Sequence, residues 1–146
     1  MTLDIQPIVY SDAAFAPILA EAERAGGAFM VRVREEWVGG VQRFDRPGEF
    51  LLGAFLERKL VGVGGLSRDP YAPQPGLGRV RHIYVLERLR GQGIGRALME
   101  AIIDRARADF TLLRLRTRSD AASSLYESLG FVRSDAEGET HRLRLR

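Results

Sequence analysis

The sequence predicts an α/β domain built on a mixed central sheet. Segments with strand character alternate with segments of helical periodicity along the 146 residues. Some neighbouring strands are separated only by short polar turns, as in antiparallel hairpins, whereas others are separated by a helix, as in parallel crossovers. The length and the hydrophobic content of 45% suit one domain over residues 1–146 with a single core.

The chain opens with a strand and a helix. Leu3–Val9 alternates weakly between apolar and polar residues, which predicts a strand. Ala14–Ala25 is rich in helix formers, and Ser11 or Asp12 can cap its N-terminus. Pro17 is expected in the first turn of this helix, where a missing N–H costs little.

A second helix, a hairpin and a third strand follow. Phe29–Phe44 is predicted as the helix, although a glycine pair lies inside it. Phe50–Leu56 and Leu60–Leu66 are apolar segments around a polar turn, which predicts the hairpin. Asp69–Gly78 contains three prolines and two glycines and is predicted as a loop before the strand Arg79–Val85.

The last third is predicted to contain two helices and three strands. Arg96–Ala108 is an amphipathic helix and Leu112–Arg118 is a strand. Asp120 is the expected N-cap of the helix Ala121–Leu129. The closing strands are predicted at Phe131–Ser134 and Thr140–Leu145.

Composition and charge exclude several classes of function. The chain has no cysteine, which excludes thiol nucleophiles and zinc–cysteine sites, and two histidines, too few for a convincing metal site. The net charge is +3. Alternation of Arg114, Arg116 and Arg118 predicts a solvated strand face rather than a nucleic-acid patch. No signal-peptide pattern or apolar run long enough for a bilayer is present, so we expect a cytoplasmic protein without a membrane partner.

The most informative segment is the turn Arg90-Gly91-Gln92-Gly93-Ile94-Gly95 between a predicted strand and a predicted helix. Glycines let a ligand approach the backbone, and a helix N-terminus offers unpaired N–H groups and partial positive charge. Together they form a phosphate cradle, which Arg90 and Arg96 flank with further charge. A Walker A loop would need Gly-Lys-Ser/Thr, and the spacing also fails the dinucleotide fingerprint.

This turn resembles the acetyl-CoA-binding motif of the GNAT superfamily of N-acetyltransferases, Arg/Gln-x-x-Gly-x-Gly/Ala. The segment from Ala122 to Phe131 resembles a second family motif, Ala-x-x-hydrophobic-Tyr-Glu-x-x-Gly-Phe. Where many members have asparagine, this chain has Ser119. The resemblance runs from about Phe50 to the C-terminus.

The resemblance implies a single-domain fold in which two central strands of the sheet splay apart and bind acetyl-CoA without a metal. The pantetheine arm would pair with main-chain groups of Ile83 and Val85, as an added strand would. The pyrophosphate would rest on N–H groups of the glycine turn. The expected contacts of the cosubstrate are then Ile83, Val85, Arg90, Gly91, Gln92, Gly93, Ile94, Gly95, Arg96 and Ser119.

Transfer of the acetyl group to an amine needs a proton acceptor and a proton donor. Tyr126 matches the family's tyrosine and is the expected general acid for the thiolate; the alternative is a tyrosine with only a packing role. Many members have a glutamate early in the strand before the turn, whereas this chain has Arg79 and Arg81. His82 is a weak candidate for the base, because alternation places it on the opposite side from Arg81 and Ile83. Glu35, Glu36 and Glu49 could line the acceptor side, although acidic residues on a helix are usually solvated.

The sequence therefore predicts an N-acetyltransferase in which a primary amine attacks acetyl-CoA directly in a ternary complex. The acceptor is a small-molecule amine or a protein or peptide amine, and no nucleic-acid partner is expected. Folds of this kind often form homodimers, and the sequence neither requires nor excludes one. The alternative is a catalytically silent acyl-CoA-binding module, which could dispense with Tyr126.

Overall fold

The computed structural model describes residues 2–26, 29–71 and 74–145. In chain order the elements are β1 (Leu3–Pro7), α1 (Asp12–Arg24), α2 (Phe29–Val38), β2 (Phe50–Leu56), β3 (Lys59–Arg68), β4 (Leu77–Val85), a short 3-10 helix (Glu87–Leu89), α3 (Ile94–Ala106), β5 (Leu112–Leu115), α4 (Asp120–Ser128), β6 (Val132–Arg133) and β7 (His141–Arg144).

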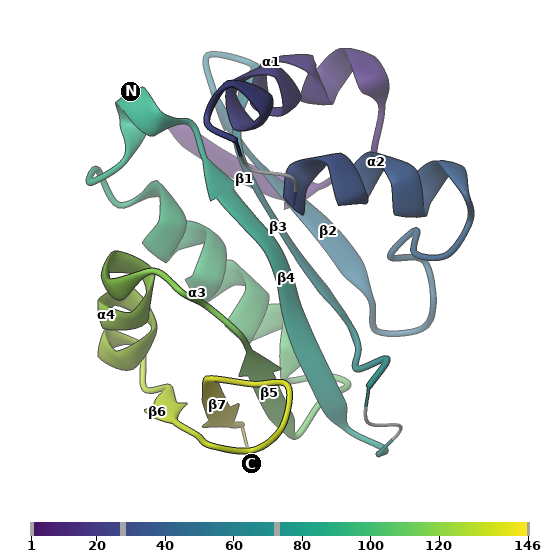
Figure 1. Ribbon diagram of the computed structural model, residues 1–146, viewed down its shortest axis with the longest axis vertical. Helices are drawn as coiled ribbons and strands as arrows, with labels where there is room; N and C mark the ends of the chain where they lie inside the picture. The colour runs from purple at the N-terminus through teal and green to yellow at the C-terminus, as the bar shows by residue number, and fades with distance from the viewer. Residues whose placement is uncertain (1, 27–28, 72–73, 146) are drawn as a thin grey trace.

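The strands form one mixed sheet with helices on both faces, which confirms the predicted fold class. The strand order is β1-β2-β3-β4-β5-β7-β6, and β4 and β5 are the parallel pair. Helices α1 and α2 cover one face, and α3 and α4 lie on the other (Figure 1). The predicted hairpin is present as β2 and β3, joined by the two-residue turn Glu57–Arg58.

The two parallel strands pair only at their beginnings. Leu77, Gly78 and Arg79 of β4 face Leu112, Leu113 and Arg114 of β5, and no later pair follows. Beyond Arg79, β4 continues to Val85 while β5 ends at Leu115, and the two diverge (Figure 1). The second half of β4 therefore has a neighbour on its β3 side and an unpaired edge on its β5 side.

A β-bulge interrupts β4 at His82 and Ile83. Val63 of β3 pairs with Tyr84 and Gly65 pairs with Arg81, so two residues of β4 stand opposite Gly64 alone. His82 adopts a φ of 61°, a left-handed conformation that is uncommon for a residue with a side chain. The predicted alternation is therefore wrong here: His82 does not lie on the opposite side from Arg81, because the bulge turns it toward Phe44, at 6.0 Å between ring centroids.

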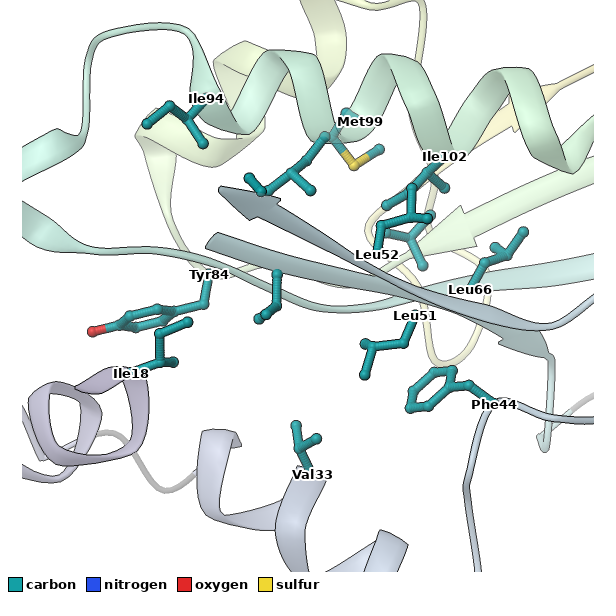
Figure 2. Close-up of a cluster of buried hydrophobic side chains, with 14 of the residues drawn as sticks. Ile18, Val33, Phe44, Leu51, Leu52, Leu66, Tyr84, Ile94, Met99 and Ile102 are labelled. Carbon is teal, nitrogen blue, oxygen red and sulfur yellow. The ribbon is translucent and has the colours of Figure 1, made fainter. Parts of the chain in front are cut away.

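The hydrophobic core lies in two layers, one on each face of the sheet. Figure 2 shows Ile18, Val33 and Phe44 below the strands and Met99 and Ile102 of α3 above them. All five side chains are buried. The helical periodicity found in the sequence therefore marks the faces that these helices turn toward the sheet.

The ends of the helices differ from the prediction: α3, for example, runs from Ile94 to Ala106 rather than from Arg96 to Ala108. Ser11 caps α1 by accepting a hydrogen bond from the Ala14 N–H at 3.2 Å, so α1 begins at Asp12 and Pro17 lies in its second turn. Helix α2 stops at Val38, because two glycines follow it. The N-cap of α4 is Ser119 rather than Asp120.

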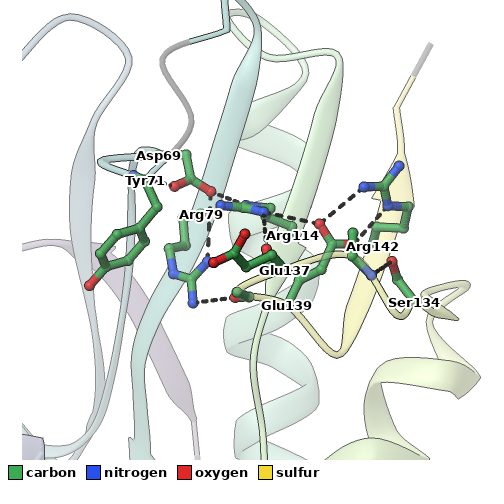
Figure 3. Close-up of polar contacts among 10 residues, drawn as sticks. Asp69, Tyr71, Arg79, Arg114, Ser134, Glu137, Glu139 and Arg142 are labelled. Carbon is green, nitrogen blue, oxygen red and sulfur yellow. Dashed lines mark hydrogen bonds and ion pairs between the residues drawn. The ribbon is translucent and has the colours of Figure 1, made fainter.

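A buried ionic cluster lies where β4 and β5 are still paired. Figure 3 shows Arg114 between Asp69 and Glu139, and the Arg114 guanidinium forms ion pairs with both carboxylates, whose side chains are fully buried. Burial by itself raises the pKa of Glu139, but hydrogen bonds from Arg142, Ser134 and Arg114 lower it to about 2. The prediction of a solvated arginine face is therefore wrong at Arg114, because the loop before β4 and the β6–β7 connection cover it.

Candidate active site

The free edge of β4 presents main-chain groups to the opening between β4 and β5. The Leu86 N–H donates to the Val61 carbonyl oxygen of β3 at 2.9 Å. Because main-chain groups alternate in direction along a strand, those of Val85 point away from β3. Ile83, the other residue expected to pair with an extended ligand, lies in the bulge, where this alternation is interrupted.

Arg90 lies over the end of this edge. Its Nε donates to the Val85 carbonyl oxygen at 2.9 Å, and its guanidinium carbon lies 5.1 Å from the centroid of the Tyr84 ring. The Tyr84 hydroxyl in turn donates to Glu21 of α1 at 2.6 Å. The side chain of Arg90 therefore holds the start of the glycine turn against β4 and occupies one of the two Val85 main-chain groups.

The glycine turn has the backbone of an anion cradle. Gly91 and Gly93 have φ values of 78° and 89°, and a Cβ built at either would meet no atom within 4 Å, so the space beside them is open. Helix α3 begins at Ile94, and its first intrahelical bond runs from the Ala97 N–H to the Gly93 carbonyl oxygen at 3.0 Å. The N–H groups before Ala97 therefore have no partner within the helix.

Two of the predicted contact residues use their side chains elsewhere. Arg96 donates from Nη2 to the Ser128 hydroxyl of α4 at 2.5 Å. The Ser119 hydroxyl accepts from the Ala122 N–H at 3.2 Å and so caps α4. Arg96 thus offers a ligand its backbone N–H and the part of its exposed guanidinium that does not bind Ser128, beside the partial positive charge of the helix end.

Helix α4 meets the cradle through Leu125, in its second turn. A Cβ on Gly95 would lie 3.6 Å from Leu125 and 3.9 Å from Val85. The structure thus brings together the end of β4, the start of α3 and the residue that precedes Tyr126. Three segments that the sequence analysis singled out separately converge at this point.

Tyr126 is buried, with 6% of its surface exposed. Its ring packs against Phe131 at 5.8 Å and His141 at 6.3 Å between centroids. Burial raises the pKa of Tyr126 to about 12, so its hydroxyl stays protonated at neutral pH. Among the described residues no hydrogen-bond partner is found for this hydroxyl.

His82 lies in the bulge, without a hydrogen-bond partner for its enclosed Nε2 in the described part of the chain. Burial, followed by the positive charges of Arg81 and Arg32, lowers the pKa of His82 to about 3. The imidazole is therefore neutral at physiological pH and holds a proton weakly. No hydrogen bond or ring contact joins it to Tyr126 within residues 2–26, 29–71 and 74–145.

Arg81 of β4 and Glu36 of α2 form an ion pair beside the bulge. The Arg81 Nη2 donates to the two oxygens of Glu36 at 3.0 and 3.1 Å. The two side chains are 16% and 21% exposed. The sequence marked Arg81 as a departure from the family pattern, but only the packing of α2 on β4 identifies Glu36 as its partner.

Comparison with known proteins places this arrangement in a family. The model of the acetyltransferase (GNAT) domain matches residues 20–145. The chain belongs to the GNAT acetyltransferase family. This confirms the resemblance on which the sequence analysis rests and extends it to most of the chain.

GNAT relatives of known sequence match over part of their length. The N-alpha-acetyltransferase RimI of Mycobacterium tuberculosis is 40% identical over 87 residues, which cover 60% of this chain and 54% of that protein. The mycothiol acetyltransferase of Paenarthrobacter aurescens is 33% identical over 110 residues, 73% of this chain and 32% of the relative. The chain thus spans about half or less of the curated relatives that it matches.

Solved GNAT structures match along the whole chain. A candidate acetyltransferase from Exiguobacterium sp. 255-15 is 29% identical, with a TM-score of 0.86, over 99% of this chain and 94% of that one. A Salmonella typhimurium protein, yncA, solved with acetyl-CoA as its cofactor, shares the fold at 16% identity and a TM-score of 0.72, over 99% and 94% of the two chains.

No helix in the described ranges is long and apolar enough to cross a bilayer. The same ranges contain no group of three or more histidine, aspartate or glutamate side chains that could hold a metal ion.

Proposed function

We propose that the protein is an N-acetyltransferase that moves the acetyl group of acetyl-CoA to a primary amine. The observation that carries this proposal is the unpaired edge of β4, which leads directly into the glycine turn at the start of α3. An extended thioester ligand that ends in a pyrophosphate fits a free strand edge followed by an anion-binding turn. The names of the relatives, an N-alpha-acetyltransferase and a mycothiol acetyltransferase, support the same chemistry.

The residues present suit acetyl-CoA. The Ile83 main chain and the Val85 N–H would pair with the pantetheine amides, as an added strand does. The open space beside Gly91 and Gly93 would take the pyrophosphate, with the free N–H groups of the α3 N-terminus as donors. Ser119 and the side chain of Arg96 would contribute less than the sequence predicted, because α4 already uses both.

The proposed reaction is a direct attack in a ternary complex. The acceptor ammonium first gives up a proton, since only the neutral amine has a lone pair. A C–N bond then forms at the thioester carbon to give a tetrahedral intermediate, which collapses as the C–S bond breaks and the nitrogen loses its second proton. The leaving thiolate takes one proton, so the products are the acetamide, free CoA and one proton released to solvent.

Tyr126 is the proposed donor of the thiolate's proton. Its pKa of about 12 keeps the hydroxyl protonated, and that hydroxyl has no partner to hold it elsewhere in the described structure. The preceding residue of α4, Leu125, lies against Gly95 of the cradle. An N–H of the β4 edge near Val85 would stabilise the oxyanion of the tetrahedral intermediate.

A second group is needed to accept the proton that the acceptor amine gives up. His82 stays a candidate by position, but a pKa of about 3 makes it a weak base near neutral pH. A chain of water molecules to solvent would serve instead. The pH dependence of turnover in a His82→Asn variant decides between the two.

The decisive experiment is a thiol-release assay with acetyl-CoA and a panel of amines. Amine-dependent release of CoA supports an enzyme. Tight acetyl-CoA binding without release for any amine would instead favour the alternative, a silent acyl-CoA-binding module on the same fold. The Tyr126 hydroxyl, which has no hydrogen-bond partner among the described residues, favours the enzyme, because such a module has no use for it.

A further inference from the structure

The ion pair between Arg81 and Glu36 has an intermediate accessibility. The side chains of Arg114 and Asp69 are only 7% and 0% exposed, whereas those of Arg96 and Glu100 are 46% and 59% exposed. Arg81 and Glu36, at 16% and 21%, are mostly buried yet still reachable from solvent. A ligand can therefore reach this pair without unfolding the element that carries it.

Arg81 uses only part of its hydrogen-bonding capacity. Both bonds to Glu36 come from a single nitrogen, Nη2. A guanidinium has five N–H donors, arranged so that two nitrogens can grip one carboxylate. The Nε and Nη1 of Arg81 have no protein partner in the described ranges, and neither is enclosed, so they are available to an anion.

The surroundings of the pair carry more positive than negative charge. Arg32 and Arg81 both act electrostatically on His82, and the neighbouring Arg79 keeps an enclosed Nη1 without a hydrogen bond. Asp69, the carboxylate nearest to Arg79 at 3.7 Å, is also bound by Arg114. An amine alone would be drawn to Glu36 and repelled by these guanidiniums, whereas a molecule that also carries a carboxylate would be attracted.

Arg81 lies on the same strand as the proposed thioester site. Arg81 directly precedes the bulge and stands two residues before Ile83 in β4. Ile83 lies on the free edge that the thioester arm would follow. A ligand anchored between Arg81 and Glu36 would thus lie beside the stretch of β4 that leads to the proposed thioester site.

We propose that Arg81 and Glu36 form the acceptor subsite of the acetyltransferase and that they bind an α-amino acid through its carboxylate and its ammonium group. This inference rests on the proposed function. The free N–H groups of Arg81 grip the α-carboxylate, and Glu36 accepts hydrogen bonds from the α-ammonium. In the empty protein the two side chains neutralise each other, and the zwitterion inserts between them with matching charges.

The test compares each standard L-amino acid with its carboxamide, which keeps the amine and loses the negative charge. We expect the wild-type protein to prefer the best free acid over its amide by at least about tenfold in kcat/KM, because the amide leaves the Arg81 donors unpaired. The preference should be in KM rather than in kcat, since the anchored carboxylate takes no part in the bond changes.

Variants of Arg81 and Glu36 show whether these two residues cause the preference for the free acid over the amide. Arg81→Gln should raise KM for the acid about tenfold or more and leave the amide unchanged, so that the preference disappears. Arg81→Lys, which keeps the charge, should restore part of it. Glu36→Gln should raise KM for acid and amide alike. Arg105→Gln, at an exposed arginine near the end of α3, should change neither substrate.

Two results would contradict the proposed subsite: one contradicts only the acceptor class, and the other contradicts the proposed function as well. If amides or peptide N-termini are acetylated as well as free acids, the acceptor class is wrong while the acetyltransferase proposal stands. If acetyl-CoA binds and no amine of any kind is acetylated, the proposed function itself fails. Melting temperatures of the variants show whether any loss comes from misfolding, and the lysine variant keeps the test valid if the glutamine variant is unstable.

Discussion

Tyr126 is the single residue on which the proposed chemistry depends most. Tyr126→Phe removes one hydroxyl and keeps the ring that packs on Phe131 and His141. We expect kcat to fall about ten- to a thousandfold, the range for losing a general acid. Affinity for acetyl-CoA should change little, because its proposed contacts are to backbone. Measuring Kd and kcat on the same variant separates the two effects.

The control for this variant is Tyr71→Phe, which makes the same change at a tyrosine that is 71% exposed. It should leave kcat unaltered. Stability should not fall in Tyr126→Phe either, because the lost hydroxyl has no partner in the described structure. An unchanged kcat with chemistry rate-limiting would reduce Tyr126 to a packing residue.

The lowered pKa of His82 predicts that the free energy of unfolding depends on pH. Its pKa is about 3 in the folded protein and near 6.5 when unfolded, so between these values the unfolded chain binds a proton that the native state does not. Stability should therefore fall as pH drops through this window, with a slope of up to about 1.4 kcal/mol per pH unit. His82→Asn keeps a residue that tolerates the left-handed backbone and should reduce this slope. The check is denaturant unfolding at several pH values.

The test depends on the difference between wild type and variant in the slope of unfolding free energy against pH, and not on the absolute stability of either protein. Buried carboxylates such as Glu139 also lose stabilising interactions on acidification, so the variant will keep some dependence on pH. The difference between wild type and variant isolates His82. Identical slopes above pH 4 would mean that the imidazole is not buried neutral, and would reopen its candidacy as the base.

At the scale of elements, the turn between β4 and α3 carries the proposed cosubstrate site. Gly93→Val should raise the Kd for acetyl-CoA at least about tenfold, because the side chain fills the open space of the cradle. It also strains a residue at a φ of 89°, which costs about 1–3 kcal/mol. Isothermal titration with acetyl-CoA measures the loss.

Gly26→Val provides the matched control for that variant. Gly26 has a φ of 76° and no atom within 4 Å of an added Cβ, so backbone strain and open space are the same. It lies two residues after the end of α1, outside the glycine turn. Equal losses of affinity in both variants would show that strain alone, and not occupation of the cradle, explains the effect at Gly93.

Local patterns predicted these elements well where the signal is itself local. The hairpin, the strand–glycine–helix unit and α4 all follow from turn residues and periodicity within about a dozen positions. The bulge at His82 was missed, because it is set by the register against Val63 and Gly65 on another strand. The burial of Arg114 was missed for the same reason: Asp69 and Glu139 are 45 and 25 residues away in sequence.

The same limit applies to the candidate site. The glycines and Tyr126 could be found because their roles follow from short motifs. The pair of Glu36 and Arg81 depends on how α2 packs on β4, which neither segment encodes alone. The glycine turn of the proposed site was therefore predictable from sequence, whereas for the acceptor side the sequence offered Glu36 only as one of three glutamates and did not pair it with Arg81.

For the whole molecule, the proposed cradle exists only when β4, α3 and α4 are assembled, so acetyl-CoA should bind the native state and not the unfolded chain. At about 100 times Kd the stabilisation should be about 2.7 kcal/mol. For a chain of this length that corresponds to a rise in Tm of about 5–10 °C. Differential scanning fluorimetry with acetyl-CoA and with CoA measures it.

Tyr126→Phe should retain the full shift and Gly93→Val should lose it, because the first variant spares the cradle and the second fills it. A wild-type protein whose Tm does not move with millimolar acetyl-CoA or CoA would lack the cosubstrate site altogether, and the acceptor subsite would then have no acetyl donor to serve.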